Sequence, residues 1–182
     1  ILAFADLGES NPDEMQHPEW ATSSGTSAPS NNNNTLYSTL RDNYPALRDI
    51  TLVSSTIPTI AIPGSSGMME SGADYEKIES ARLLSSSEYS LNSALGYLSL
   101  KTQIDDDCVL AVAFQYTKGG QTYQVGEFST DNSDDTSKTL YVKLLKSTAG
   151  NPEHSIWDLM MKNIYSLGVT NLQQSNFTMQ IQ

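Results

Sequence analysis

Apolar and polar residues alternate most clearly in two runs, 109–117 and 121–129, that flank the dipeptide Gly119-Gly120. Two glycines accept the positive φ angles of a tight turn, so the pattern predicts a β-hairpin. The turn sets a register in which one face is mostly apolar and the other polar. The predicted pairs are Tyr116 with Tyr123, Phe114 with Val125 and Val112 with Glu127 on one face, and Thr117 with Thr122 and Gln115 with Gln124 on the other. Gly126 falls opposite Ala113, where the absent side chain allows a close approach.

Other β-type runs lie on both sides of this hairpin. They cover residues 1–8, 77–84, 95–100 and 139–145, with a turn at 92–96 before the third of these. In the last run, Leu140, Val142 and Leu144 alternate with Tyr141 and Lys143. Such alternation is typical of a strand with one buried face.

Two stretches carry a helical period. Leu36, Leu40 and Tyr44 recur every four residues and predict a short helix that ends at Pro45. Residues 155–168 open with a capping pattern and end at a glycine, and predict an amphipathic helix. Its apolar side chains are Ile156, Leu159, Met160, Ile164 and Leu167, with Trp157, Met161 and Tyr165 beside them. Residues 46–62 are apolar and β-branched but contain prolines, so they predict an edge strand or an extended covering segment.

These elements predict a mainly β fold with helices, of the α+β class: an antiparallel β-sandwich-like sheet with the C-terminal amphipathic helix packed on it. The predicted segments are 1–34, an N-terminal segment with a polar linker; 35–72, a helix plus an extended covering segment; and 73–182, a β-rich domain that contains the C-terminal helix. The chain starts at Ile1, and its last residues, NFTMQIQ, have the pattern of a truncated strand. We therefore expect a piece of a longer polypeptide.

Composition narrows the function classes. The 182 residues carry a formal net charge of −11, with a pI of about 4.4. A chain this acidic repels phosphates, which argues against binding to nucleic acid and to anionic lipid headgroups. Cys108 is the one cysteine, so an intrachain disulfide is impossible, and we expect its side chain to be buried or half-buried at the start of a strand.

Motifs for catalysis are missing from the sequence. His17 and His154 stand alone in proline-flanked loops, and there is neither a nucleophile elbow nor a phosphate-binding glycine loop. We expect a protein that is not an enzyme, with no catalytic residue and no cofactor. Candidate metal ligands are confined to two acidic clusters, Asp105, Asp106 and Asp107 before the hairpin and Asp131, Asp134 and Asp135 after it. Calcium would need six to eight oxygens from both loops, and solvated surface loops are the alternative.

A candidate partner-binding surface lies in the predicted C-terminal helix. It consists of Trp157, Met160, Met161 and Tyr165, and packing in the core of the domain is the alternative interpretation.

Four segments in order resemble one known family. They are DYEKIESARLLSSSEYSLNSALGYLSL (74–100), VLAVAFQYTKGGQTYQVGEFS (109–129), LYVKLLKS (140–147) and WDLMMKNIYSLG (157–168), with a looser fit at 36–51. Together they resemble the SprA/Sov family of gliding motility and type IX secretion proteins. Members are very large outer-membrane translocons that export folded cargo proteins to the cell surface, and this chain is similar to a soluble internal domain of them.

The resemblance implies a non-catalytic structural or partner-docking domain in the cell envelope, on the periplasmic or the cell-surface side of the outer membrane. The implied partners are other parts of the parent translocon, plug or cargo-receptor proteins, and transiting cargo, without nucleic acid. Two alternatives stay open: a surface-exposed β-sandwich module that binds a glycan or calcium, and a hydrolase whose site no motif marks.

Overall fold

A four-stranded sheet forms the centre of the molecule. The computed structural model describes residues 1–11, 28–60, 68–132, 138–161, 175 and 178. The strands lie in the order β2 (Tyr75–Lys77), β1 (Leu2–Phe4), β8 (Tyr141–Lys146), β5 (Leu110–Val112). The predicted α+β, β-rich class is confirmed. The sheet is mixed, however, because β1 pairs in parallel with β8, whereas its pairing with β2 and that of β5 with β8 are antiparallel.

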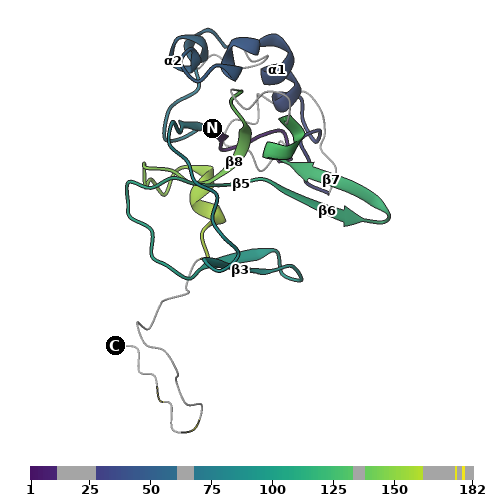
Figure 1. The fold of residues 1–182 in the computed structure, drawn as a ribbon, viewed down its shortest axis with the longest axis vertical. Coiled ribbons are helices and arrows are strands. Elements are labelled where there is room, and N and C mark those ends of the chain that lie inside the picture. The colour runs from purple at the N-terminus through teal and green to yellow at the C-terminus, as the bar shows by residue number, and fades with distance from the viewer. Residues whose placement is uncertain (12–27, 61–67, 133–137, 162–174, 176–177, 179–182) are drawn as a thin grey trace.

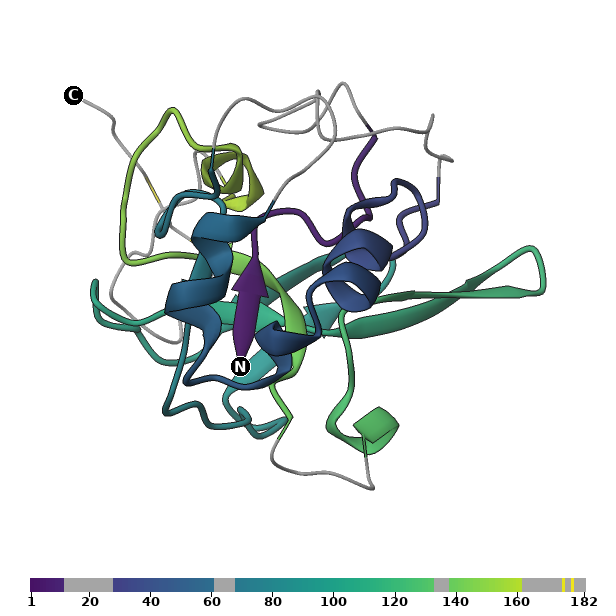
Figure 2. The same ribbon diagram turned by 90° about the horizontal axis from the view of Figure 1, so that it is seen from above.

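Helices cover one face of this sheet (Figures 1 and 2). They are α1 (Leu36–Asn43), η3 (Pro45–Arg48), α2 (Val53–Thr56) and η4 (Ile57–Thr59). The helix expected before Pro45 is confirmed as α1. The extended segment expected at 46–62 is wrong over its described part, which is largely helical. Prolines stand in the first turns of η3 and η4, where they favour helix initiation, and Leu47, Val53 and Ile57 are buried in the core.

The core has one cluster on each face of the sheet. Leu2, Phe4 and Tyr141 pack against the helical layer, while Ala3, Val142 and Leu144 belong to the cluster on the other face with Ile156. β8 is therefore buried on both faces, and the expectation of a strand with one solvated face is wrong. Residues of the first predicted segment supply the central strand β1, so the sheet joins segment 1–34 to segment 73–182.

Two hairpins stand outside the central sheet. One is β3 (Tyr89–Asn92) with β4 (Tyr97–Leu100), and the other is β6 (Phe114–Lys118) with β7 (Gln121–Val125). The β6–β7 register matches the predicted pairs from Phe114 with Val125 to Thr117 with Thr122. The predicted pairing of Val112 with Glu127 is wrong, because Val112 pairs with Lys143 of β8. In both views the β6–β7 hairpin projects away from the body of the protein (Figures 1 and 2).

The chain bends where the hairpin leaves the body. Gly126 has a φ of 77°, and a β-carbon added there would lie 2.9 Å from the Cβ of Ala113. The predicted close approach of these two residues is confirmed. The long β-type run at 109–117 divides at this point into β5 and β6, on either side of Ala113.

The C-terminal helix differs from the prediction. A 3₁₀ helix, η6 (Ser155–Leu159), replaces its first part, and Met160 has an extended backbone with φ −75° and ψ 135°. His154 and not Ser155 occupies the N-cap position, and its side chain makes no capping hydrogen bond. Residues 162–168 lie outside the described residues. Ile156 nevertheless packs on the sheet as expected. Within the described ranges, no helix combines the length and the apolar composition needed to cross a bilayer.

Candidate functional site: the β6–β7 hairpin

Three aromatic rings line one face of the projecting hairpin. Tyr116 and Tyr123 are cross-strand partners with ring centroids 5.3 Å apart and planes 19° from parallel. Phe114 lies beside Tyr116 at 6.2 Å and 26°. Phe114 is 38% exposed, and both tyrosines are half-buried. These three residues, the aromatic face, form an apolar surface that the core does not cover.

The base of the hairpin is fixed by the segment before α1. The Tyr116 hydroxyl donates to the carbonyl oxygen of Pro29 at 2.8 Å, and the Asn31 N–H donates to the carbonyl oxygen of Gln124 at 2.9 Å. The Gly126 N–H in turn donates to Oδ1 of Asn31 at 2.9 Å. Hydrogen bonds at both strands of the hairpin hold its direction relative to the body.

Glu127, two residues after β7, is the centre of a buried polar network. Its carboxylate accepts hydrogen bonds from Arg48 at 2.6 and 2.7 Å, from the Tyr37 hydroxyl at 2.7 Å and from the Tyr141 N–H at 3.0 Å. The Arg48 guanidinium also lies 3.8 Å from the centroid of the Tyr141 ring, a cation–π contact. Burial, with help from the Glu127 hydrogen bond and charge, raises the pKa of Tyr37 to about 12. The network ties the hairpin to α1, η3 and β8.

A second buried charged pair joins Lys143 to Glu9. The Lys143 ammonium lies 2.6 Å from Oε1 of Glu9 and also donates to the carbonyl oxygen of Ala5, while Oε2 of Glu9 accepts from the Leu7 N–H at 2.6 Å. Burial raises the pKa of Glu9, and the positive charge of Lys143 opposes that shift. This pair accounts for a buried lysine in β8 and acts as a structural clamp on the loop after β1.

The structure groups only some of the acidic residues that were predicted as metal ligands. Asp105 and Asp107 lie with Cys108 so that one ligand atom from each falls within 4.8 Å of the others, and all three side chains are exposed. Asp106 does not join this group, Asp131 lies in η5 (Ser129–Asn132), and Asp134 and Asp135 lie outside the described residues. Three exposed ligand atoms, one of them a thiol, are fewer and softer than the six to eight oxygens of a calcium site. The expectation of a buried or half-buried Cys108 is wrong.

The predicted partner surface in the C-terminal part is brought together only in part. Met160 and Met161 are 50% and 45% exposed, so these two side chains do not pack in the core. Trp157 is half-buried, and Tyr165 lies outside the described residues.

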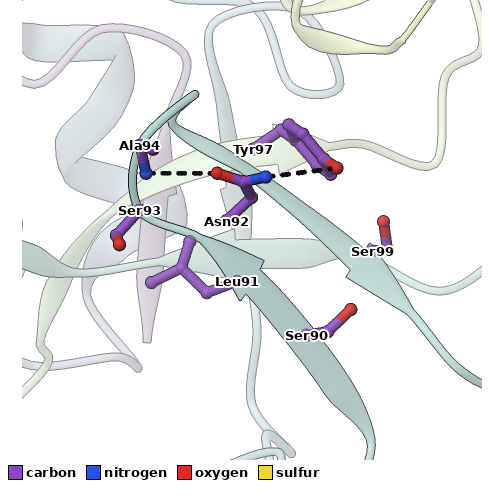
Figure 3. Close-up of a pocket in the computed structure, with 7 residues that line it drawn as sticks. All are labelled: Ser90, Leu91, Asn92, Ser93, Ala94, Tyr97 and Ser99. Carbon is purple, nitrogen blue, oxygen red and sulfur yellow. Dashed lines mark hydrogen bonds between the residues drawn. The ribbon is translucent and has the colours of Figure 1, made fainter.

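A shallow, open hollow lies on the β3–β4 hairpin (Figure 3). Its turn is held by Asn92, whose Oδ1 accepts from the Ala94 N–H at 3.1 Å and whose Nδ2 lies 3.5 Å from the Tyr97 hydroxyl. The residues that line it are Ser90, Leu91, Asn92, Ser93, Ala94, Tyr97 and Ser99. This lining includes serines without a histidine, lysine or carboxylate, so it offers no base to activate a hydroxyl nucleophile.

The sequence pattern does not mark the aromatic face as a site. Its residues were expected to form the apolar side of a hairpin packed on a core, and alternation alone does not tell whether a core covers them. Arg48 and Glu127 were missed as well, since partners 79 positions apart leave no local pattern. A search against models of protein families found no match, and no curated protein matches the chain.

Proposed function

We propose that this chain is a non-catalytic docking domain of a type IX secretion translocon, and that the aromatic face of the β6–β7 hairpin is its contact surface. The observation that carries the proposal is the exposed Phe114 beside two half-buried tyrosines on a hairpin that projects from the body. Aromatic side chains are enriched at protein interfaces because they bury a large apolar area with few rotatable bonds.

The anchoring of the hairpin supports a binding role. Hydrogen bonds to Pro29 and Asn31 and the network of Glu127 hold the hairpin in one direction. A surface that is already ordered loses little conformational entropy when a partner docks. The four segments that resemble the SprA/Sov family include both strands of this hairpin, which connects the surface to protein export across the outer membrane.

The polar groups described above are compatible with a docking role. The hollow on β3–β4 carries no histidine, lysine or carboxylate, and the buried carboxylates of Glu9 and Glu127 are engaged by Lys143 and Arg48. The proposed partners are other parts of the translocon, its plug or cargo-receptor proteins, or the cargo itself. The proposed location is the cell envelope, at the outer membrane.

The test replaces one cross-strand pair in the full-length parent protein, in a bacterium that exports cargo by this route. The variant Tyr116→Ala/Tyr123→Ala removes two rings of the aromatic face. The control Thr117→Ala/Thr122→Ala truncates the neighbouring pair on the opposite face. Cargo on the cell surface is measured together with the amount of parent protein in the outer membrane.

We expect the tyrosine variant to lower cargo export at least tenfold at an unchanged amount of parent protein, and the threonine variant to export normally. Normal export by the tyrosine variant would show that the aromatic face has no part in secretion. Equal loss in both variants would point to damage to the hairpin and would also count against the proposal.

A further inference from the structure

Among the residues that the structure describes, the β6 strand has one paired edge and one open edge. Its paired edge carries β7. The preceding strand, β5, continues into β6 after Ala113; it has β8 as its neighbour and is the outermost strand of the central sheet. The Glu127 N–H donates to the carbonyl oxygen of Tyr141 at 2.8 Å, so the end of β7 meets the start of β8. β7 and β8 therefore lie on the same side of the β5–β6 run, and its other side is an edge (Figure 1).

The backbone groups that point out from this edge follow from the register. In a hairpin closed by a two-residue turn, cross-strand pairs alternate between hydrogen-bonded pairs and pairs whose N–H and C=O groups point outward. Lys118 and Gln121 close the turn, so Gln115 with Gln124 and Thr117 with Thr122 are outward-pointing pairs. The carbonyl of Gln124 accepts from Asn31 on the outer side of β7, which agrees with this assignment.

By the same alternation, Gln115 and Thr117 direct their N–H and C=O groups away from β7. Both side chains are exposed. Within the described ranges, no residue makes a backbone hydrogen bond to these groups. Proteins usually protect an edge of this kind with prolines, inward-pointing charges or bulges, because it is a template for another strand. β6 contains no proline, and its one charged residue is Lys118 at the tip.

We propose that the outer edge of β5–β6 is a site of β-strand addition, which accepts an extended peptide segment of a partner protein. This inference rests on the proposed docking function and names the mode of binding. The added strand runs antiparallel to β6, as β7 does to β6 and β8 does to β5. Main-chain hydrogen bonds to Gln115 and Thr117 provide the affinity, and side chains at alternate positions provide the specificity.

The residues that flank this edge indicate which residue types the partner segment should contain. Alternate side chains of the added strand lie beside Phe114 and Tyr116, so these positions fit β-branched or aromatic residues that extend the aromatic face. The exposed acidic residues 105–107 precede β5, and Lys118 ends β6. An antiparallel strand brings its C-terminal end to the acidic loop, where lysine or arginine is complementary.

The probe is a fluorescent twelve-residue peptide, ten residues of alternating valine and threonine followed by two lysines, titrated against the whole 182-residue chain by anisotropy. Thr117→Pro removes an outward N–H of β6 and leaves the hydrogen bonds to β7 intact. Thr122→Pro is the matched control, since it makes the same change in the cross-strand partner on the other edge. Far-UV circular dichroism checks that both variants fold.

We expect Thr117→Pro to raise the Kd at least tenfold and Thr122→Pro to raise it less than twofold. A peptide methylated on the amide nitrogens of its threonines needs no protein variant and is expected to lose binding, because these N–H groups face Gln115 and Thr117 when the valines lie beside Phe114 and Tyr116. Exchange of its lysines for glutamates is expected to weaken binding. Equal binding of the methylated peptide would overturn strand addition. A dimer of the chain that Thr117→Pro dissolves would overturn the proposed occupant, because the edge would then pair with a second copy of this chain. Failure of peptide binding while export still depends on Tyr116 and Tyr123 would reject this mode of binding and leave the docking function standing.

Discussion

Glu127 should be one of the most important polar residues for the stability of this fold. Its carboxylate accepts hydrogen bonds from Arg48, from Tyr37 and from the backbone of Tyr141, and its side chain is 8% exposed. The variant Glu127→Ala removes all of these acceptors and leaves the guanidinium of Arg48, 19% exposed, without its counter-ion. Breaking a buried ion pair from one side costs ~3–5 kcal/mol.

That loss would be a large part of the total, because domains of this size are stable by about 5–15 kcal/mol. Urea unfolding of the 182-residue chain near neutral pH measures the change in unfolding free energy. Glu88→Ala is the control, since Glu88 pairs with Arg82 at the surface and its removal should cost a small fraction of the Glu127 effect.

A double variant distinguishes the loss of the whole ion pair from the burial of one unpaired charge. Arg48→Met/Glu127→Leu removes both charges and should be less destabilised than Glu127→Ala, because no uncompensated charge stays buried. A decrease in unfolding free energy below ~1 kcal/mol for Glu127→Ala would refute the reasoning, since the loss of an exposed ion pair costs no more than that. It would mean that Glu127 does not anchor the hairpin.

Further predictions concern Tyr141, two glycines and the acidic loop. Burial raises the pKa of Tyr141 to about 12 from its ordinary value of 10.0, so this group contributes stability that is complete below pH 10 and lost as pH rises through about 12. Above pH 10, the unfolding free energy of Tyr141→Phe should therefore fall less steeply with pH than that of the unmodified protein, by up to ~1.4 kcal/mol per pH unit. Gly126→Ala should cost more than Gly120→Ala in urea unfolding, because both have positive φ but only Gly126 is crowded by Ala113. Calcium should not raise the melting temperature above that in chelator, because the loop before β5 gathers three exposed ligand atoms.

Local chemistry was enough to predict the elements whose turns and periods are self-contained. The Gly119-Gly120 turn set the β6–β7 register, and the four-residue period of Leu36 and Leu40 marked α1. Over residues 46–60, β-branched side chains favoured an extended segment, but burial of Leu47, Val53 and Ile57 against the sheet selects short helices. Intrinsic propensity is weaker than packing in that segment.

Long-range contacts explain most of what the sequence could not predict. The parallel pairing of β1 with β8 joins residues about 140 positions apart, and nothing local in residues 1–8 indicates it. The lysine of β8 suggested a solvated face, whereas the structure buries it against Glu9. At the site, the turn predicted the hairpin and alternation predicted its apolar face, but its projection beyond the core depends on the bend at Gly126.

The most direct test of the docking proposal is photocrosslinking within the working translocon. A photoreactive amino acid is placed at Tyr116 in the full-length parent protein, and at Thr122 as a control on the opposite face. Adducts formed during cargo export are identified by mass spectrometry. We predict adducts from position 116 with translocon segments, plug or cargo-receptor proteins, or cargo, and none from position 122. Ongoing export with no such adduct from position 116 would contradict the account.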